Sequence, residues 1–257
     1  MSKDETVVLL HESSVLSKPK LWQIPQPGAA AYQRLPEKTA ALCRRLREIY
    51  ARHGRVKLAS SLAAEDMVLT DILAREALRM EVFVLETGRL NRETLVLADE
   101  VRCRYPDLDL RLYFPDAAQV AAYVGQFGAN AFYDSVERRR QCCHIRKVEP
   151  LNRALADADA WITGQRRGQS STRSRLPLAE EDRARGIAKY NPLADWGEQD
   201  VWAYVLQHRL PCNALYRQGY PSIGCEPCTM PVKAGEDIRS GRWWWESRDS
   251  KECGLHK

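Results

Sequence analysis

The chain has 257 residues, of which 44% are hydrophobic and 28% charged, and its formal net charge is +5. This length fits one main domain with a smaller appended region, and the mild positive charge favours a small anionic ligand. Without a long basic run, a signal peptide or an apolar stretch of ~20 residues, we expect neither nucleic acid nor a membrane as partner. We expect a cytoplasmic protein whose eight cysteines serve metal or redox chemistry.

The predicted elements begin after an N-terminal arm, residues 1–35, which has little periodicity. Pro36 marks the expected start of the first helix, and Gly54 ends it. From Val56 onward, short apolar strands alternate with helical patterns. Strands are expected at 56–59, 81–85, 108–114 and 160–163, and helices at 65–78, 92–104 and 117–127. Strands separated by helices of this length predict an α/β fold with a doubly wound, mainly parallel sheet.

Polar segments follow two of these strands, at the edge of the sheet where such folds bind ligands. Ser60 and Ser61 follow the first strand, where their hydroxyls and the amides of the next helix can hold an anion. The alternative is that a serine only caps that helix. After strand 160–163 comes a segment with four arginines: Arg166, Arg167, Arg173 and Arg175. Guanidinium groups there can bind phosphate or sulfate oxygens, unless the loop is simply solvated.

Tryptophans mark two further segments. Trp196 and Trp202, with Val201 and Val205, recur at helical spacing and are expected in the core. Three consecutive tryptophans at 243–245 cannot all point into one core, so at least one is expected at a cleft or an interface.

Four cysteines form two tight groups, an adjacent pair and a Cys-x-x-Cys sequence. They are Cys142, Cys143, Cys225 and Cys228. Gly224 and Pro227 favour a sharp turn that aims both sulfurs of the second group at one point. A disulfide, a redox pair and free buried thiols are alternatives to a metal centre. Zinc and an iron–sulfur cluster both stay open, although adjacent cysteines point apart and suit a bulky multi-iron core better.

Together these residues closely resemble the assimilatory sulfonucleotide reductases, specifically the iron–sulfur adenylylsulfate reductases, from about Val56 to His256. The matching motifs lie at 142–147, 163–167, 222–228, 241–246 and 252–256. The resemblance implies the fold of the ATP pyrophosphatases, also described as adenine nucleotide alpha hydrolase-like, with a mobile C-terminal tail. We accordingly expect three parts: the arm 1–35, a nucleotide-binding and iron–sulfur domain 36–240, and a catalytic tail 241–257.

The resemblance also implies an activity, the reduction of adenosine 5′-phosphosulfate to sulfite and AMP with reduced thioredoxin as electron donor, in sulfate assimilation. It implies one four-iron four-sulfur cluster on the four cysteines, a set that favours the unphosphorylated nucleotide. Cys253 is the candidate nucleophile, which would displace AMP and carry an S-sulfonate until thioredoxin attacks it. The residues implied to bind substrate are Ser60, Ser61, Lys147, Arg166, Arg239, Arg242 and His256.

Three alternatives are a 3′-phosphoadenylylsulfate reductase, a tRNA-thiolating ATP pyrophosphatase and a non-enzymatic zinc module that binds nucleic acid. The glycine-rich Ser-Gly-Gly-x-Asp-Ser loop of the pyrophosphatases is absent, which argues against ATP cleavage. A zinc module would not need the tail that carries Cys253. Glu86 and Asn91 depart from residues common in relatives, so the contacts of that turn are left open, as is whether the protein is a homo-oligomer.

Overall fold

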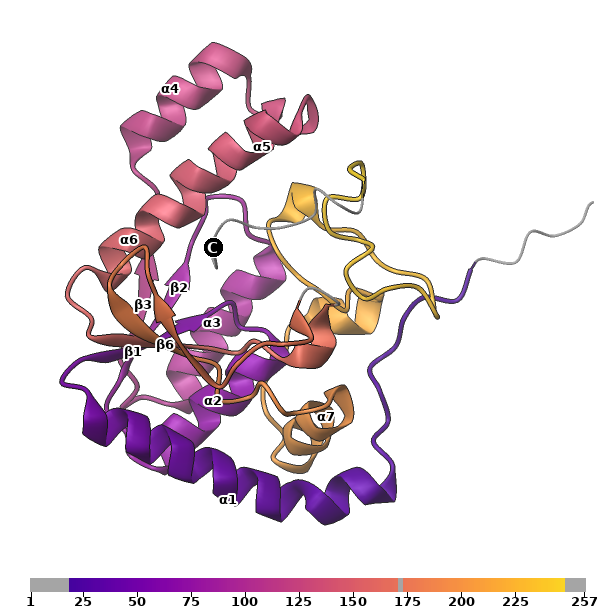
Figure 1. Cartoon of the computed structure of the whole chain (residues 1–257). Coiled ribbons are helices and arrows are strands. Elements are labelled where there is room, and N and C mark those ends of the chain that lie inside the picture. The colour runs from indigo at the N-terminus through magenta and orange to yellow at the C-terminus, as the bar shows by residue number, and fades with distance from the viewer. Residues whose placement is uncertain (1–18, 171–172, 248–257) are drawn as a thin grey trace, which may run out of the picture.

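Six strands form one sheet in the order β3-β2-β1-β4-β6-β5, as the computed structural model shows (Figure 1). The strands are β1 (Val56–Ser60), β2 (Glu81–Leu85), β3 (Leu110–Tyr113), β4 (Ala160–Thr163), β5 (Ala179–Asp182) and β6 (Ile187–Tyr190). All neighbouring pairs are parallel except β5 with β6. The structure describes residues 19–170 and 173–247.

Seven α-helices connect and cover the strands in the described part of the chain. They are α1 (Ala29–Arg52), α2 (Ala64–Arg75), α3 (Arg92–Arg104), α4 (Ala117–Phe127), α5 (Val136–Cys143), α6 (Glu149–Leu155) and α7 (Glu198–Gln207). A π-helical segment, His144–Val148, joins α5 to α6 in one continuous helical run (Figure 1). Pro150 cannot donate a backbone hydrogen bond four residues back, which explains why α-helical bonding is interrupted here.

The sheet buries both of its faces. Val82 and Val84 of β2 belong to a large apolar core shared with α1, α2, α3 and α7. Phe83, between them, packs instead with Leu151 of α6 and Trp161 of β4. Because successive side chains of a strand point to opposite faces, this separation confirms the predicted doubly wound arrangement. None of the described helices has the length and apolarity that a membrane crossing requires.

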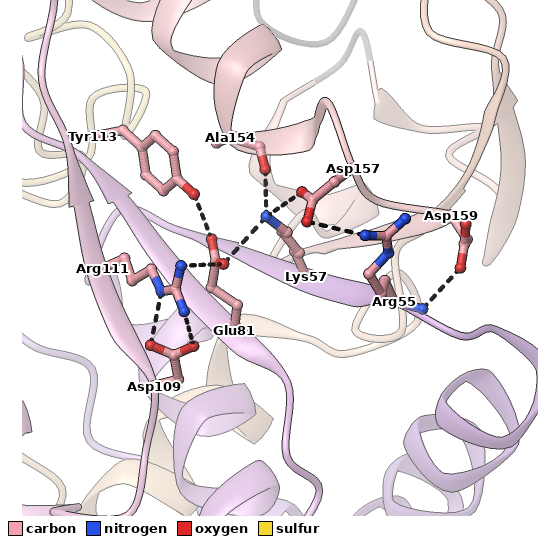
Figure 2. A network of polar contacts seen from close by, with 9 residues as sticks. All are labelled: Arg55, Lys57, Glu81, Asp109, Arg111, Tyr113, Ala154, Asp157 and Asp159. Carbon is pink, nitrogen blue, oxygen red and sulfur yellow. Dashed lines mark hydrogen bonds and ion pairs between the residues drawn. The ribbon is translucent and has the colours of Figure 1, made fainter.

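The amino ends of the strands are joined by a network of paired charges (Figure 2). The buried Lys57 ammonium donates to the Ala154 carbonyl at 2.8 Å and forms ion pairs with Asp157 at 2.7 Å and Glu81 at 3.2 Å. Burial alone lowers the pKa of Lys57, but the hydrogen bonds that its ammonium group donates to Asp157 and Glu81 raise the pKa above its ordinary value. Glu81 also accepts from the Tyr113 hydroxyl at 2.9 Å. The charged side chains at this edge of the sheet are therefore paired with one another.

The predicted bounds of β2, α3, α4 and β4 are confirmed, and other ends shift by a few residues. The expected helix start at Pro36 is wrong, because α1 begins at Ala29 and continues through the proline. Residues 29–35 therefore belong to α1 and not to an arm. Pro36 is exposed, so water can bond the carbonyl group whose intrahelical partner the proline removes.

Two further features differ from the sequence prediction. The β5–β6 hairpin was not predicted, because edge strand β5 reads Ala-Glu-Glu-Asp and shows no apolar alternation. The other concerns residues 241–247, the described part of the expected tail. Met230 N–H donates to the Gly241 carbonyl at 2.9 Å and Trp243 N–H to the Cys228 carbonyl at 3.1 Å. Residues 241–247 therefore pack on the main domain.

Candidate functional site

A cavity of about 270 Å³ lies at the carboxyl ends of β1, β2 and β4. The chain moves outward from β1 in one direction to β2 and β3, and β4 lies on the other side of β1, so this is the switch point of the sheet. Every described residue predicted to bind substrate lines the cavity: Ser60, Ser61, Lys147, Arg166, Arg239 and Arg242. Cys253 and His256 lie outside the described residues.

The predicted four-arginine segment contributes only part of itself to this cavity. Arg166 and Arg173 line it. Arg167 instead donates to the Leu176 carbonyl at 2.9 Å on the exposed side of the loop, and Arg175 is exposed. The ligand-site interpretation thus applies to Arg166 and Arg173, and the solvated-loop interpretation applies to Arg167 and Arg175.

The loop between β1 and α2 is closed by a carboxylate of the protein itself. The backbone N–H and the hydroxyl of Ser61 both donate to Asp66 Oδ2 at 2.7 Å. The Ser60 hydroxyl accepts from the Leu62 N–H at 3.1 Å. Neither serine caps α2, whose N-cap is Ala63 and has no side-chain cap, so the N-cap alternative is wrong. Both Ser61 donors are thus used internally, and the cations of the cavity are the stronger attraction for an anionic ligand.

Asp66 is buried beneath this loop. Burial raises the pKa of Asp66 to about 6, with a smaller contribution from Glu65, although the hydrogen bonds from Ser61 act in the opposite direction. Its Oδ1 atom lies so close to Gly164 that a Cβ on that glycine would be 2.2 Å away. The Thr-Gly step after β4 therefore leaves room for the carboxyl group of the neighbouring loop.

Arg166 is neutralised within the cavity wall. Its side chain is buried, and its Nη2 atom lies 2.6 Å from Glu65 Oε1 while Nε donates to the same oxygen at 2.8 Å. Glu198 lines the same cavity, and burial raises the pKa of its carboxyl group while Arg166 lowers it. Three carboxyl groups, including Asp66, therefore line a cavity that also holds several cations.

Arg242 differs from Arg166 in its partners. Its side chain is 8% exposed and its Nη1 donates to the Ile223 carbonyl at 3.2 Å. Within the described residues, the buried Nε atom has no hydrogen-bond partner. The guanidinium group also lies over the Trp243 ring, 5.0 Å from its centroid. A buried cation with an unused donor in a cavity wall is suited to an anionic ligand.

A second, smaller hollow collects all four predicted metal ligands: Cys142, Cys143, Cys225 and Cys228. All four are free thiols, so the disulfide alternative is wrong for this structure. Arg89, Arg139 and Arg146 also line the hollow. Lys147 and Trp243 line both this hollow and the larger cavity, so the thiol group and the anion site share a wall.

The turn after β2 holds the Cys-x-x-Cys segment in place. The Thr87 hydroxyl lies 3.3 Å from Cys225 Sγ, and Asn91 Nδ2 donates to the Gly224 carbonyl at 3.0 Å. Arg146, on the π segment beside the cysteine pair, donates to the Thr87 carbonyl at 2.7 Å. The sequence places this turn at the ligand-binding edge of the sheet but leaves its side-chain contacts open, and those contacts hold the Cys-x-x-Cys segment.

The thiol hollow suits an anionic metal centre. Burial, with a smaller contribution from Cys225, raises the pKa of Cys228 to about 12, whereas Lys147 and Arg242 act to lower it. Burial also raises the pKa of Cys142, and Arg146 opposes this. Metal coordination would release these thiol protons, and the nearby cations would stabilise the resulting thiolates. Among the residues that the structure describes, no three acidic, histidine or cysteine side chains are placed to hold a single metal ion.

The sheet order and the position of the cavity define a fold of the ATP pyrophosphatase type. A crystal structure of phosphoadenylyl-sulfate reductase from Candida auris, a phosphate complex, matches with a TM-score of 0.64 and 22% identity, over 81% of this chain and all of that one. An NH3-dependent NAD synthetase from Campylobacter jejuni matches with a TM-score of 0.50 and 14% identity, over 68% of this chain and 74% of that one. At these identities the likeness concerns the fold.

Residues 55–231 match the family model described as the phosphoadenosine phosphosulfate reductase domain, and the chain belongs to this family. Relatives named adenosine 5′-phosphosulfate reductase include one from Neisseria meningitidis serogroup B, 59% identical over 95% of this chain and 99% of that protein. Another, from Burkholderia cepacia, is 60% identical over 82% of this chain and 84% of that protein. A third, from Allochromatium vinosum, is 50% identical over 87% of each.

Proposed function

We propose that this protein reduces adenosine 5′-phosphosulfate to sulfite and AMP in sulfate assimilation, with reduced thioredoxin as electron donor in the cytoplasm. The names of its relatives, at 50–60% identity, support the substrate and the reaction. The observation that carries the proposal is the buried Arg242, whose Nε has no partner among the described residues, in a cavity of about 270 Å³ that shares a wall with four thiols.

The cavity residues have a chemical task in this reaction. The sulfur of a phosphosulfate is shielded by negatively charged oxygens, which repel an attacking thiolate. Cations beside the cavity, Lys147, Arg239 and Arg242, would reduce that repulsion and hold the oxygens in position. They would also stabilise the negative charge that develops on AMP as it leaves.

Cys253 is the proposed nucleophile. Its thiolate attacks the sulfate sulfur, a sulfur–sulfur bond forms, and the sulfur–oxygen bond breaks so that AMP leaves with the electron pair. A thioredoxin thiolate then attacks the sulfur of Cys253 and releases sulfite. The second thioredoxin thiol resolves the mixed disulfide, so the dithiol supplies both electrons.

We also propose that Cys142, Cys143, Cys225 and Cys228 hold one four-iron four-sulfur cluster. Support comes from the four free thiols around one hollow and from the cations that line it, because a cluster with four thiolates is anionic. When bound, the cluster would cross-link the end of α5 to the Cys-x-x-Cys segment, with Lys147 in the wall between it and the substrate cavity.

Carboxylates in the larger cavity support the unphosphorylated nucleotide as substrate. Glu65 is paired with Arg166, but Asp66 and Glu198 also line the cavity, and their carboxylates would oppose one more phosphate. The two nucleotides differ by the 3′-phosphate, and the carboxylates of the cavity wall disfavour that additional negative group.

The test is sulfite formation by the purified chain with reduced thioredoxin and either nucleotide. We expect a higher kcat/KM for adenosine 5′-phosphosulfate in direct competition. A higher value for the 3′-phosphorylated compound would contradict the substrate assignment, and no sulfite from either compound would contradict the reaction. Omitting thioredoxin is the control, and it should stop multiple turnover.

A further inference from the structure

The segment before α1 is bound to the protein by backbone pairing. Trp22 N–H donates to the Val232 carbonyl at 2.8 Å, and Ala234 N–H donates to the Lys20 carbonyl at 2.9 Å. Residues 20–22 therefore run antiparallel to residues 232–234, which connect the Cys-x-x-Cys segment to Arg239. The sequence prediction of a peripheral arm is wrong for these residues. They also lie outside the region 55–231 that matches the family model.

Trp22 belongs to a group of three packed aromatic rings. Its ring centroid is 6.3 Å from that of Trp202 and 6.1 Å from that of Tyr216, and the latter two are 5.0 Å apart. The Tyr216 hydroxyl accepts from the Ala64 N–H at 2.9 Å, at the start of α2. The aromatic group thus connects the N-terminal segment to the loop that carries Ser60 and Ser61.

All three rings line the larger cavity, but they are not equally accessible. Trp202 is 4% exposed and Tyr216 is 3% exposed, whereas Trp22 is only partly buried. Backbone bonds on one side and ring packing on the other restrict Trp22 before any ligand arrives. An aromatic side chain restricted in this way loses little entropy when it makes a contact.

We propose that Trp22 contacts the bound sulfonucleotide, so that the N-terminal segment forms part of the substrate site. This inference rests on the proposed function. A flat, partly exposed indole in the wall of this cavity can contribute van der Waals and stacking contacts to a purine ring.

The test uses the full chain with three substitutions. Trp22→Ala removes the ring, Trp22→Leu keeps apolar packing against Trp202 and Tyr216 but removes the flat face, and Trp22→Phe keeps an aromatic face. Gln23→Ala is the matched control, because Gln23 is the exposed neighbour on the same segment. Calorimetry measures the affinity for AMP, and sulfite assays measure KM for the intact substrate.

We expect about tenfold weaker AMP binding for the alanine and leucine variants, near-parent binding for phenylalanine and no change for Gln23→Ala. Iron content should match the parent. A higher KM for the intact substrate with unchanged AMP affinity would support contact at the sulfonate end. Parent-like AMP affinity and KM in Trp22→Leu would overturn the inference, even if Trp22→Ala unfolds.

The outcomes separate this inference from the proposed function. If the parent produces sulfite and all Trp22 variants match it, only the inference fails. If the parent binds AMP but produces no sulfite, the proposed reaction fails, and weaker AMP binding by the leucine variant would still establish the contact with Trp22.

Discussion

The Arg242 guanidinium lies directly against Gly224, the residue before Cys225. A Cβ atom on Gly224 would be 2.3 Å from Arg242 Nη2 and 2.5 Å from Cζ, and Arg242 Nη1 donates to the carbonyl of the preceding Ile223. The φ angle of Gly224 is not positive, so the turn itself does not require glycine here. Glycine is needed at this position because the Arg242 guanidinium group occupies the space where a Cβ atom would lie.

Gly224→Ala should therefore displace Arg242 and weaken nucleotide binding. The loss of a charge-assisted hydrogen bond costs about 1.5–3 kcal/mol, which corresponds to roughly 10- to 150-fold in affinity. Calorimetry with AMP measures this, and iron analysis shows whether the thiol site persists.

Gly125→Ala is the control, because a Cβ there meets nothing within 4 Å. The double variant Gly224→Ala with Arg242→Ala should bind no more weakly than Arg242→Ala alone, since both changes act through the same group. An additional loss in the double variant would show that Gly224 acts on something other than Arg242.

The sequence predicts what depends on local pattern and misses what depends on distant partners. The bounds of α3, α4, β2 and β4 follow from periodicity and flanking turns. Strand β5 was missed because its residues show no apolar alternation, and Glu180 and Asp182 are instead held by ion pairs with Lys189 and Arg185. Gly224 was assigned to a turn because Arg242, the residue that needs the space, is far away in the chain.

The sequence predicts which residues line the cavity, but not which of them bond to one another. Ser60, Ser61 and the cations lie together because they follow parallel strands or belong to recognisable motifs. Nothing local indicates that Ser61 bonds Asp66, or that Trp22 reaches the cavity from beyond the matched region. The Ser61 bonds depend on how the loop after β1 turns back onto α2, and the position of Trp22 arises from tertiary packing.

Cys225→Ala should lose iron and activity together. Removing one of four thiolate ligands leaves part of a cluster uncoordinated and weakens the cross-link between α5 and the Cys-x-x-Cys segment. Iron and acid-labile sulfide analysis after anaerobic purification measures the loss. Cys103→Ser, an exposed thiol on α3 away from the hollow, should keep both. A full complement of iron and sulfide in Cys225→Ala would remove this residue from the proposed ligand set.

Asp66 should make the protein less stable as pH rises. Its folded-state pKa of about 6 exceeds the ordinary value of 3.8, so the folded state holds this proton more tightly than the unfolded state does. The stabilisation is complete below about pH 4 and is lost as pH rises through about 6, a change of about 3 kcal/mol. Asp66→Asn cannot titrate. Its melting temperature relative to the parent should therefore increase from pH 4 to pH 8.

Thermal melts of both proteins across this pH range test the prediction. Asp99→Asn, which alters an exposed carboxylate on α3, is the control and should leave the pH dependence unchanged. If the difference between Asp66→Asn and the parent is constant with pH, Asp66 is not the titrating group.

Glu246→Gln should destabilise the packing of residues 241–247. Arg139 and Glu246 are 1% and 4% exposed, and they form two bonds, Nε–Oε1 at 2.5 Å and Nη2–Oε2 at 3.0 Å. Removing one charge of a buried pair leaves the other uncompensated, at a cost of about 3–5 kcal/mol. Urea unfolding measures this loss of stability, with Glu226→Gln, at an exposed position, as control. The double variant Arg139→Met with Glu246→Leu removes both charges and should regain the lost stability. A lower stability of the double variant than of Glu246→Gln would contradict the charge argument.

Cys253→Ser should keep its iron and its affinity for AMP but lose sulfite production almost completely. An ordinary cysteine has a pKa of about 8.5, so only a few per cent is thiolate at neutral pH unless cations favour ionisation. Lys251 and His256 are close to Cys253 in the sequence. A serine hydroxyl at the same position stays protonated and is a far poorer nucleophile.

The parent, given adenosine 5′-phosphosulfate without thioredoxin, should gain one sulfonate on Cys253 and stop until a dithiol is added. Intact-protein mass spectrometry followed by peptide mapping measures the adduct and its position. Cys212→Ala is the matched control and should form the same adduct, because its partly buried thiol has its pKa raised to about 12 mainly by burial. A sulfonate on another cysteine, or repeated turnover by Cys253→Ser, would remove Cys253 from the proposed mechanism.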